Sequence, residues 1–338
     1  MSYECRHLRN TFCNKRKTEC DPGAPGCVLR GRFVFPFSES ANDSSKKKPK
    51  PDKDEFTLIK TGYIFQKILY RALLASSWKR GVVQANLKYI HPDYSDLICL
   101  NIYKQIINHL THHVSDILFE FNLFKKLPHD FSSYPFIQNG ITYKLSEGSE
   151  PVLKKMREGG IFLTAHYGNY EAIGPWLCRL SIPLKASYIP LKPAALNRIV
   201  ENRIRSVDKV NYSVNAKSPR EFLRLLDEKK LFCLLMDQDS RIESAATSTF
   251  LGKQVHVNPL PDFLLRHRPE TPVFICWLEE TASEKILHAT EITPTGNSVN
   301  EAFNHWLEKR IAEKPALWYG WTHRRFYSCN PEIYSKLE

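Results

Sequence analysis

The stretch that decides the fold of this chain is Ile161–Glu171, which reads IFLTAHYGNYE. Its first five residues, Ile161–Ala165, form a short apolar run of the kind found in a buried strand. The residues after the turn, from Ala172 to Leu180, have the pattern of a helix. The stretch therefore predicts a strand-to-helix turn that begins with His166.

A histidine at such a turn, five residues before Glu171, can act as a general base. The imidazole takes a proton from a hydroxyl near neutral pH, and the carboxylate orients the ring and stabilises the imidazolium. No serine or cysteine nucleophile is then required, because the hydroxyl of the substrate can attack an activated acyl group. The H-x4-E pattern taken alone is also compatible with a structural histidine. The other motifs of the chain therefore decide between a structural and a catalytic role for His166.

From residue 150 onward, expected strands and helices alternate along the chain. The strands are expected at 160–165, 184–190, 231–236, 272–279 and 286–292, and the helices at 150–157, 169–180, 194–206, 218–229 and 299–313. Ser218-Pro219-Arg220-Glu221 is a capping box with proline at the first helical position. Such alternation predicts an α/β fold with a mainly parallel, mixed sheet flanked by helices. Walker A and G-x-G-x-x-G motifs are both missing, so nucleotide binding is not indicated.

The rest of the chain is expected to divide at a basic linker. Residues 1–55 form a cysteine-containing extension and linker, and residues 56–338 form the main domain, with a helical lead-in at 56–148 and an α/β core at 149–328. The extension contains Cys5, Cys13, Cys20 and Cys27, whose spacing lacks C-x2-C pairs. A small metal-bound cap and a loosely packed extension both fit this spacing. The chemistry at His166 itself requires no metal and no cofactor.

The charge of the chain points to an anionic partner. The 338 residues carry a formal net charge of +12, which suits nucleic acid, anionic lipid headgroups or an acidic carrier protein. We expect no transmembrane helix, because no apolar run reaches 18 residues, and no secretory signal. The segment from Tyr63 to Trp78 has an apolar face flanked by lysine and arginine. That face can either lie in a membrane interface or pack onto the catalytic domain.

Further polar residues are expected near His166. Asp237 and Asp239 follow the apolar run 231–236, and Arg203 and Arg205 belong to the helix expected at 194–206. Functional groups of α/β proteins gather where parallel strands end at their carboxyl edge. The base, the carboxylates and the arginines are therefore predicted to converge in one cleft.

Other motifs accompany this set in a characteristic order. They are the segment 79–87 (KRGVVQANL) followed by His91-Pro92, the turn Asp237-Gln238-Asp239, the element Phe250-Leu251-Gly252, and the segment 321–326 (WTHRRF). In this order, together with the H-x-G-N-x-E context of His166, they resemble the late acyltransferases of lipid A and lipopolysaccharide biosynthesis, the lauroyl/myristoyl acyltransferase family. The resemblance extends from residue 60 to residue 328 and implies a glycerolipid acyltransferase-like fold.

The resemblance also implies roles for the site residues. His166 would deprotonate the acceptor hydroxyl and Glu171 would orient it, as the HX4E motif of the family does. The oxygen would attack the thioester of an acyl carrier protein or of coenzyme A. Arg205, with Arg203 as the alternative, would bind an acceptor phosphate or carboxylate or stabilise the oxyanion. Asp237, and with it Asp239, would position that arginine or the acceptor sugar.

The family usually begins with a membrane-anchoring helix, which is not found here. From the apolar stripe and basic side chains at residues 60–80, we expect a peripheral enzyme on the cytoplasmic face of the inner membrane, acting on a lipid acceptor. One alternative is an acyltransferase of this family that acts on another glycolipid or on a natural-product hydroxyl. A nucleic-acid-binding protein would also explain the positive charge. It would not explain the H-x4-E and WTHRRF motifs, and no helix-turn-helix or RNP-like sequence is present, so we expect no nucleic-acid partner.

Overall fold

The computed structural model describes residues 8–9, 12–19, 53–120, 124–187, 194–203, 205–208, 210–214, 218–294 and 298–337. The chain divides into two compact units, Met1–Phe56 and Thr57–Glu338. Within the first unit, the strands β1 (Leu8–Arg9), β2 (Phe12–Cys13) and β3 (Thr18–Glu19) form a small antiparallel sheet. The Cys13 side chain is buried there, whereas Cys5, Cys20 and Cys27 lie outside the described residues.

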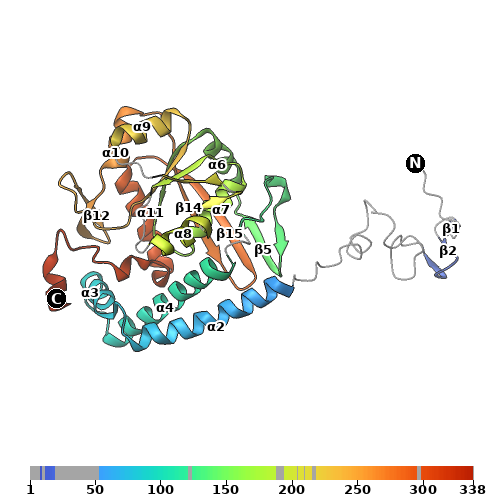
Figure 1. Cartoon of the computed structure of the whole chain (residues 1–338), viewed down its shortest axis with the longest axis horizontal. Coiled ribbons are helices and arrows are strands. Elements are labelled where there is room, and N and C mark those ends of the chain that lie inside the picture. Colours follow the sequence, from blue (N-terminus) through green and yellow to red (C-terminus); the bar gives the residue numbers. More distant parts are fainter. Residues whose placement is uncertain are drawn as a thin grey trace. The chain divides into compact units, whose positions relative to one another are not determined.

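An eight-stranded sheet organises the larger unit (Figure 1). Its strands follow the order β10-β7-β11-β6-β14-β15-β5-β4. In chain order they are β4 (Phe136–Gln138), β5 (Ile141–Leu145), β6 (Gly160–Thr164), β7 (Leu184–Ser187), β10 (Ser213–Val214), β11 (Leu231–Leu235), β14 (Val273–Glu280) and β15 (Glu284–Ile292). The pairs β14–β15 and β4–β5 are antiparallel and the other neighbours are parallel, so the predicted mixed, mainly parallel sheet is confirmed.

Helices surround this sheet, and two small hairpins extend from it. The helices are α2 (Lys53–Ala75), α3 (Arg80–Ile90), α4 (Asp96–Ser115), α6 (Ser149–Lys155), α7 (Tyr170–Arg179), α8 (Ala194–Arg203), α9 (Pro219–Asp227), α10 (Leu260–His267) and α11 (Val299–Glu313). The hairpins are β8–β9 (Ser206–Val207 and Val210–Asn211) and β12–β13 (Ala246–Phe250 and Lys253–Val257). The capping box predicted at Ser218 is present. The Ser218 side chain accepts from the Glu221 backbone N–H, and the Glu221 side chain accepts from the Ser218 backbone N–H.

The central strand β6 is apolar because both of its faces are covered. All five of its residues are buried, as expected for a parallel strand between two helical layers. Ile161 and Leu163 belong to the core shared with α3, α4, α9 and α11, whereas Phe162 belongs to the core shared with α6 and α7. Alternate side chains of one strand therefore hold two different helical layers, and the strand has no solvent-facing side.

The helical lead-in predicted before the core is formed by α2, α3 and α4. Helix α2 approaches the end of α4 closely at Gly62. A Cβ atom at this position would lie 2.9 Å from the Ser115 hydroxyl, and that hydroxyl donates to the Gly62 carbonyl at 2.8 Å. The contact ties α2 to the domain at the position where its exposed face begins.

Candidate active site

The register of two strands places His166 beside Asp237. Strands β6 and β11 are parallel neighbours, and Thr164 pairs with Leu235 at their carboxyl ends. His166 and Asp237 each lie two residues beyond these positions, so both emerge at the same edge of the sheet. The Met236 backbone N–H also donates to the Thr164 carbonyl at 3.0 Å, which continues the pairing up to the two functional residues.

The His166 ring and the Asp237 carboxylate form a hydrogen-bonded pair. His166 Nδ1 lies 2.8 Å from Asp237 Oδ1, and the His166 backbone N–H donates to Oδ2 at 3.0 Å. The Trp318 indole Nε1–H donates to the same Oδ2 at 2.9 Å. Asp237 is 2 % exposed and Trp318 is fully buried, so three donors hold the carboxylate inside the protein.

This geometry corrects the role that the sequence predicted for Glu171. The carboxylate that orients the imidazole is Asp237, 71 residues away along the chain, and Nδ1 is bonded to it. Glu171 is the second residue of α7 and acts on His166 through its charge. A carboxylate in the first turn of a helix interacts favourably with the helix dipole, which accounts for its place in the motif. The H-x4-E spacing thus marks the turn but does not identify the bonded partner.

The two groups shift each other's protonation. Burial disfavours the charged form of Asp237, but the His166 charge and the three hydrogen bonds outweigh it and lower the pKa of the carboxyl to about 2. Burial also lowers the pKa of His166, and the charges of Asp237 and Glu171 with the Asp237 hydrogen bond reverse this, so its pKa is raised. An ionised carboxylate can only accept, so the Nδ1 proton belongs to His166, and in the neutral ring Nε2 carries the free lone pair.

The turn that carries His166 is fixed from the C-terminal part of the chain. Tyr167 forms an isolated antiparallel bridge with Trp318. The Tyr319 backbone N–H donates to the His166 carbonyl at 2.8 Å, and the Gly168 N–H donates to the Leu317 carbonyl at 2.9 Å. Gly168 has a φ of +56°, a left-handed conformation that favours glycine. Residues 317–319 therefore act as a template for the backbone of the turn.

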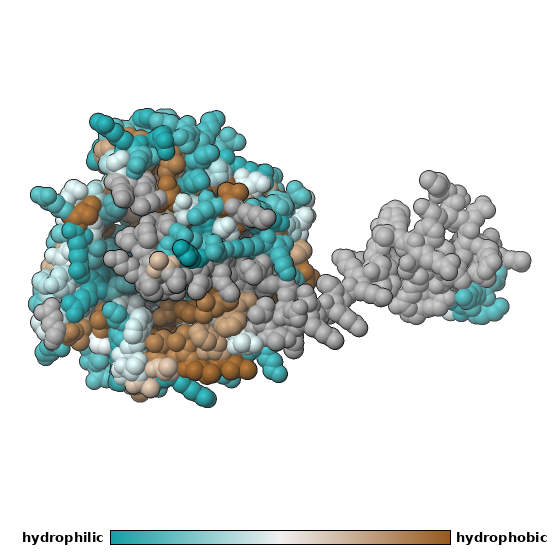
Figure 2. Space-filling view, viewed as in Figure 1, coloured by the Kyte–Doolittle hydropathy of each residue, from teal (hydrophilic) through white to brown (hydrophobic). Residues whose placement is uncertain are grey.

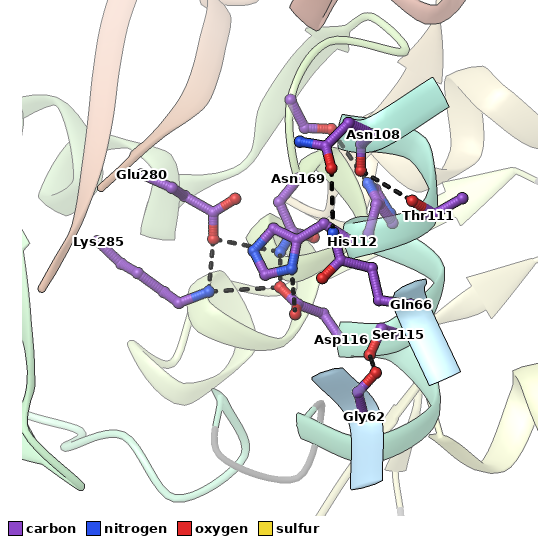
Figure 3. A network of polar contacts seen from close by, with 12 residues as sticks. Gly62, Gln66, Asn108, Thr111, His112, Ser115, Asp116, Asn169, Glu280 and Lys285 are labelled. Atoms are coloured by element: carbon purple, nitrogen blue, oxygen red, sulfur yellow. Dashed lines mark hydrogen bonds and ion pairs between the residues drawn. The ribbon is translucent and has the colours of Figure 1, made fainter. Parts of the chain in front are cut away.

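A buried ionic cluster supports the other end of the same turn (Figure 3). The Asn169 side chain donates to Asp116 Oδ2 at 2.9 Å and to Glu280 Oε1 at 3.3 Å. Lys285 Nζ lies 2.6 Å from Glu280 and 3.4 Å from Asp116. Burial opposes the charge of Lys285, yet the two carboxylates raise its pKa. Lys285, with His112 Nδ1 3.5 Å from Asp116 Oδ1, thus lies against a buried aspartate and a partly buried glutamate that hold the asparagine of the H-x-G-N-x-E motif.

The structure separates the remaining predicted site residues. Arg205 follows α8, and its charge acts on Tyr170 and Tyr212, two residues that the Glu171 charge also reaches. Arg203 ends α8, and its side chain lies outside the described part of the chain. Asp239 accepts from the Ser328 hydroxyl at 2.8 Å and lies 3.5 Å from Arg241 Nε, so its polar contacts are with the C-terminal segment and with its own loop, not with His166.

The WTHRRF segment is divided between the site and the core. The ring of His323 lies beside that of His166, with centroids 5.7 Å apart. Arg325 is 1 % exposed, donates to the His256 carbonyl at 2.8 Å and lies over the Phe250 ring. Phe250 in turn packs edge-on against Trp318, so the Phe250-Leu251-Gly252 element supports the residue that bonds Asp237.

Two groups of site residues were not found from the sequence. Nothing in the sequence distinguishes Trp318 from the other aromatic residues around it. Lys285 did leave a signal, because it occupies an inward position in the alternating strand β15, in line with Leu287 and Ala289. A lysine in such a position is rarely buried without a partner, and Asp116 and Glu280 are those partners.

Within the described ranges the structure contains neither a metal-binding cluster nor a membrane-spanning helix. Among those residues, no group of three or more histidine, cysteine, aspartate or glutamate side chains could hold a metal ion. Over the same ranges, no helix has the length and apolar character needed to cross a bilayer.

The fold and the site together define an α/β protein with a hydrogen-bonded imidazole–carboxylate pair at the carboxyl edge of its sheet. The family model of the bacterial lipid A biosynthesis acyltransferases matches residues 68–328. The chain therefore belongs to this family and is an acyltransferase. A comparison with curated proteins finds no match.

Proposed function

We propose that this acyltransferase moves a fatty acyl group from a carrier-protein or coenzyme A thioester to a lipid hydroxyl in a late acylation step of lipid A biosynthesis. The observation that carries the proposal is the His166–Asp237 pair, with 2.8 Å between Nδ1 and Oδ1. It leaves Nε2 as the proton acceptor, and the His166 side chain is 15 % exposed and so reachable by a substrate. This pair replaces the histidine–glutamate dyad expected from the sequence.

In the proposed reaction, Nε2 of His166 takes the proton of the acceptor hydroxyl while the oxygen attacks the thioester carbonyl carbon. Asp237 stabilises the imidazolium that forms, as its ionised state and its bond to Nδ1 allow. The tetrahedral intermediate then expels the thiolate, which takes the proton back from His166. Arg205 is proposed to contact an anionic group of the acceptor or of the donor, since its charge reaches Tyr170 at the turn.

The net charge of +12 supports an acidic carrier protein as the acyl donor. Encounter between oppositely charged proteins is accelerated by electrostatic attraction, and high salt weakens the effect. Comparing turnover of carrier-protein and coenzyme A thioesters at low and high salt tests this part of the proposal. Equal use of both donors at both salt concentrations would contradict it.

Helix α2 supports peripheral attachment to a membrane. The exposed fractions of Tyr63, Ile64 and Ile68 are 56 %, 51 % and 62 %, and Figure 2 shows apolar side chains along the lower edge, where α2 runs. Lys67 and Arg71 are exposed on the same helix, four residues apart and so on one side of it. Tyr70, Leu73 and Leu74 instead pack against the core. Of the two roles expected for this segment, its beginning thus suits a membrane interface and its end packs onto the domain.

The acceptor is tested by mass spectrometry of the lipids of cells with and without the gene. Loss of one secondary acyl chain from lipid A is the expected result. Unchanged lipid A together with the loss of an acyl chain from another glycolipid would contradict the proposed acceptor while leaving the acyl transfer intact.

A further inference from the structure

His323 lies beside His166, and the acyl transfer proposed above gives it no role. Its ring centroid lies 5.7 Å from that of His166, and the two ring planes are inclined at 44°. Its neighbours Trp321, Thr322 and Arg325 are buried, whereas His323 is exposed. The segment therefore buries most of its other side chains and presents this imidazole next to His166.

The backbone of His323 is held in place by a buried asparagine. The Asn86 side chain is fully buried, and its Nδ2 donates to the carbonyls of Trp321 and His323, each at 2.8 Å. The Tyr334 hydroxyl donates to Asn86 Oδ1 at 2.6 Å, which fixes the orientation of the amide. The His323 N–H donates to the Gly320 carbonyl at 3.0 Å. These hydrogen bonds fix the backbone position of His323 and thereby hold its imidazole beside His166.

The surroundings of the two histidines shift their pKa values in opposite directions. Desolvation by the surrounding protein, followed by the charges of His166 and Lys79, lowers the pKa of His323, and the charge of Asp237 only partly offsets this. His166, bonded to Asp237, has a raised pKa. Neighbouring groups whose pKa values are pushed apart divide the acid and base roles between them. At neutral pH, His323 is the neutral partner and has one N–H to donate.

We propose that His323 is a substrate-binding hydrogen-bond donor that stabilises the oxyanion of the thioester carbonyl while His166 removes the proton. The proposal rests on the acyl transfer proposed above. The acceptor O–H bond breaks as its proton moves to His166, and a C–O bond forms at the carbonyl carbon. The carbonyl electron pair moves onto the oxygen, which accepts the His323 N–H. When the C=O bond re-forms, the C–S bond breaks, and the thiolate takes the proton from His166.

The kinetic test compares His323→Ala and His323→Gln with wild type, using dodecanoyl thioesters of carrier protein and of coenzyme A and a lipid A precursor that lacks secondary acyl chains. Loss of one oxyanion donor lowers kcat about 10²–10³-fold, with little change in KM. Glutamine keeps an N–H donor but cannot act as a base, so H323Q should recover at least ~10-fold over H323A. His305→Ala, at an exposed position of α11, is the control and should keep wild-type kinetics.

A second measurement does not depend on turnover. In protein labelled with ¹⁵N-histidine, the His323 ring should be neutral at pH 7 and should protonate at lower pH than the His166 ring. An active wild type with H323A within threefold of it, or with H323Q as impaired as H323A, would overturn this inference alone, as would a protonated His323 at pH 7. A wild type that consumes neither thioester would overturn the proposed acyl transfer and this inference together.

Discussion

At the scale of single residues, the central feature is that Asp237 decides which nitrogen of His166 accepts a proton. Its Oδ1 lies 2.8 Å from Nδ1 and accepts the Nδ1 proton. Its charge is one of the causes that raise the pKa of His166. Glu171 contributes charge without a bond to the ring. The two carboxylates therefore make different predictions, although both lie near the same imidazole.

Asp237→Asn should lower kcat by about 10²–10⁴-fold, because the amide neither fixes the tautomer nor stabilises the imidazolium. The base form of His166 predominates above its pKa. Removing the charge lowers that pKa, so the acid limb of the kcat/KM profile should move to lower pH. Glu171→Gln is the matched control, and it should move the limb in the same direction while keeping kcat within ~10-fold of wild type. An equal loss of kcat in both variants would restore the histidine–glutamate pairing.

At the scale of elements, the C-terminal segment that contains Trp318 and Trp321 holds the turn that carries His166. Both indoles are fully buried and both donate, Trp318 to Asp237 and Trp321 to the Pro315 carbonyl, each at 2.9 Å. The two indole rings pack edge to face, with ring centroids 4.8 Å apart. They differ in one respect, since only the Trp318 bond reaches the active site.

Trp318→Phe removes a donor that lowers the pKa of Asp237, so the carboxylate becomes more basic and raises the pKa of His166 further. The acid limb of kcat/KM should therefore move to higher pH, opposite to Asp237→Asn, with a loss of about tenfold in kcat. Trp321→Phe should lower the free energy of unfolding by about as much as Trp318→Phe does, and it should leave the acid limb of the kcat/KM profile in place. A common shift, or none, in the two variants would show that Trp318 has only a packing role.

The ionic cluster beneath Asn169 makes a prediction about stability. Lys285→Met leaves the buried Asp116 and the partly buried Glu280 without the ammonium group between them, which should cost about 3–5 kcal/mol of unfolding free energy. Lys155→Met breaks an exposed pair with Glu291 and should cost no more than ~1 kcal/mol. Urea unfolding measures both, and equal losses would contradict a structural role for the cluster.

At the scale of the whole molecule, the exposed face of α2 should bind anionic vesicles at low salt and release them at high salt, with weaker binding to neutral vesicles. The double variant Ile64→Asp and Ile68→Asp should abolish co-sedimentation. Val210→Asp, an equally exposed apolar position on β9, should leave it unchanged. Wild-type protein that stays in the supernatant with anionic vesicles at low salt would contradict peripheral attachment.

The sequence predicted the sheet and its helices well because their patterns are local. The apolar run Ile161–Ala165 and the capping box at Ser218 depend only on near neighbours in the chain. The helix expected at 194–206 ends earlier, at Arg203, and the β4–β5 and β12–β13 hairpins were not foreseen. Each of those short strands depends on pairing with a partner, which a pattern within one strand does not reveal.

The site was predicted only in part because its bonds join distant segments. His166 and Asp237 were both named, and both lie at the predicted sheet edge, but the bond between them depends on the register of β6 with β11. Trp318 reaches Asp237 through the path of the C-terminal segment across the domain. A spacing of five residues, as in His166 to Glu171, cannot report such contacts, so it indicated the wrong carboxylate.

The central claim, that His166 is the base of an acyl transfer, is tested most directly by His166→Ala in an assay of thioester cleavage coupled to acyl transfer. The account predicts an unchanged circular dichroism spectrum and a fall in turnover of at least ~10²-fold. The remaining activity should also lose the acid limb that wild type is expected to show at a pH above the ordinary histidine pKa. A folded His166→Ala protein with near-normal turnover would contradict the account.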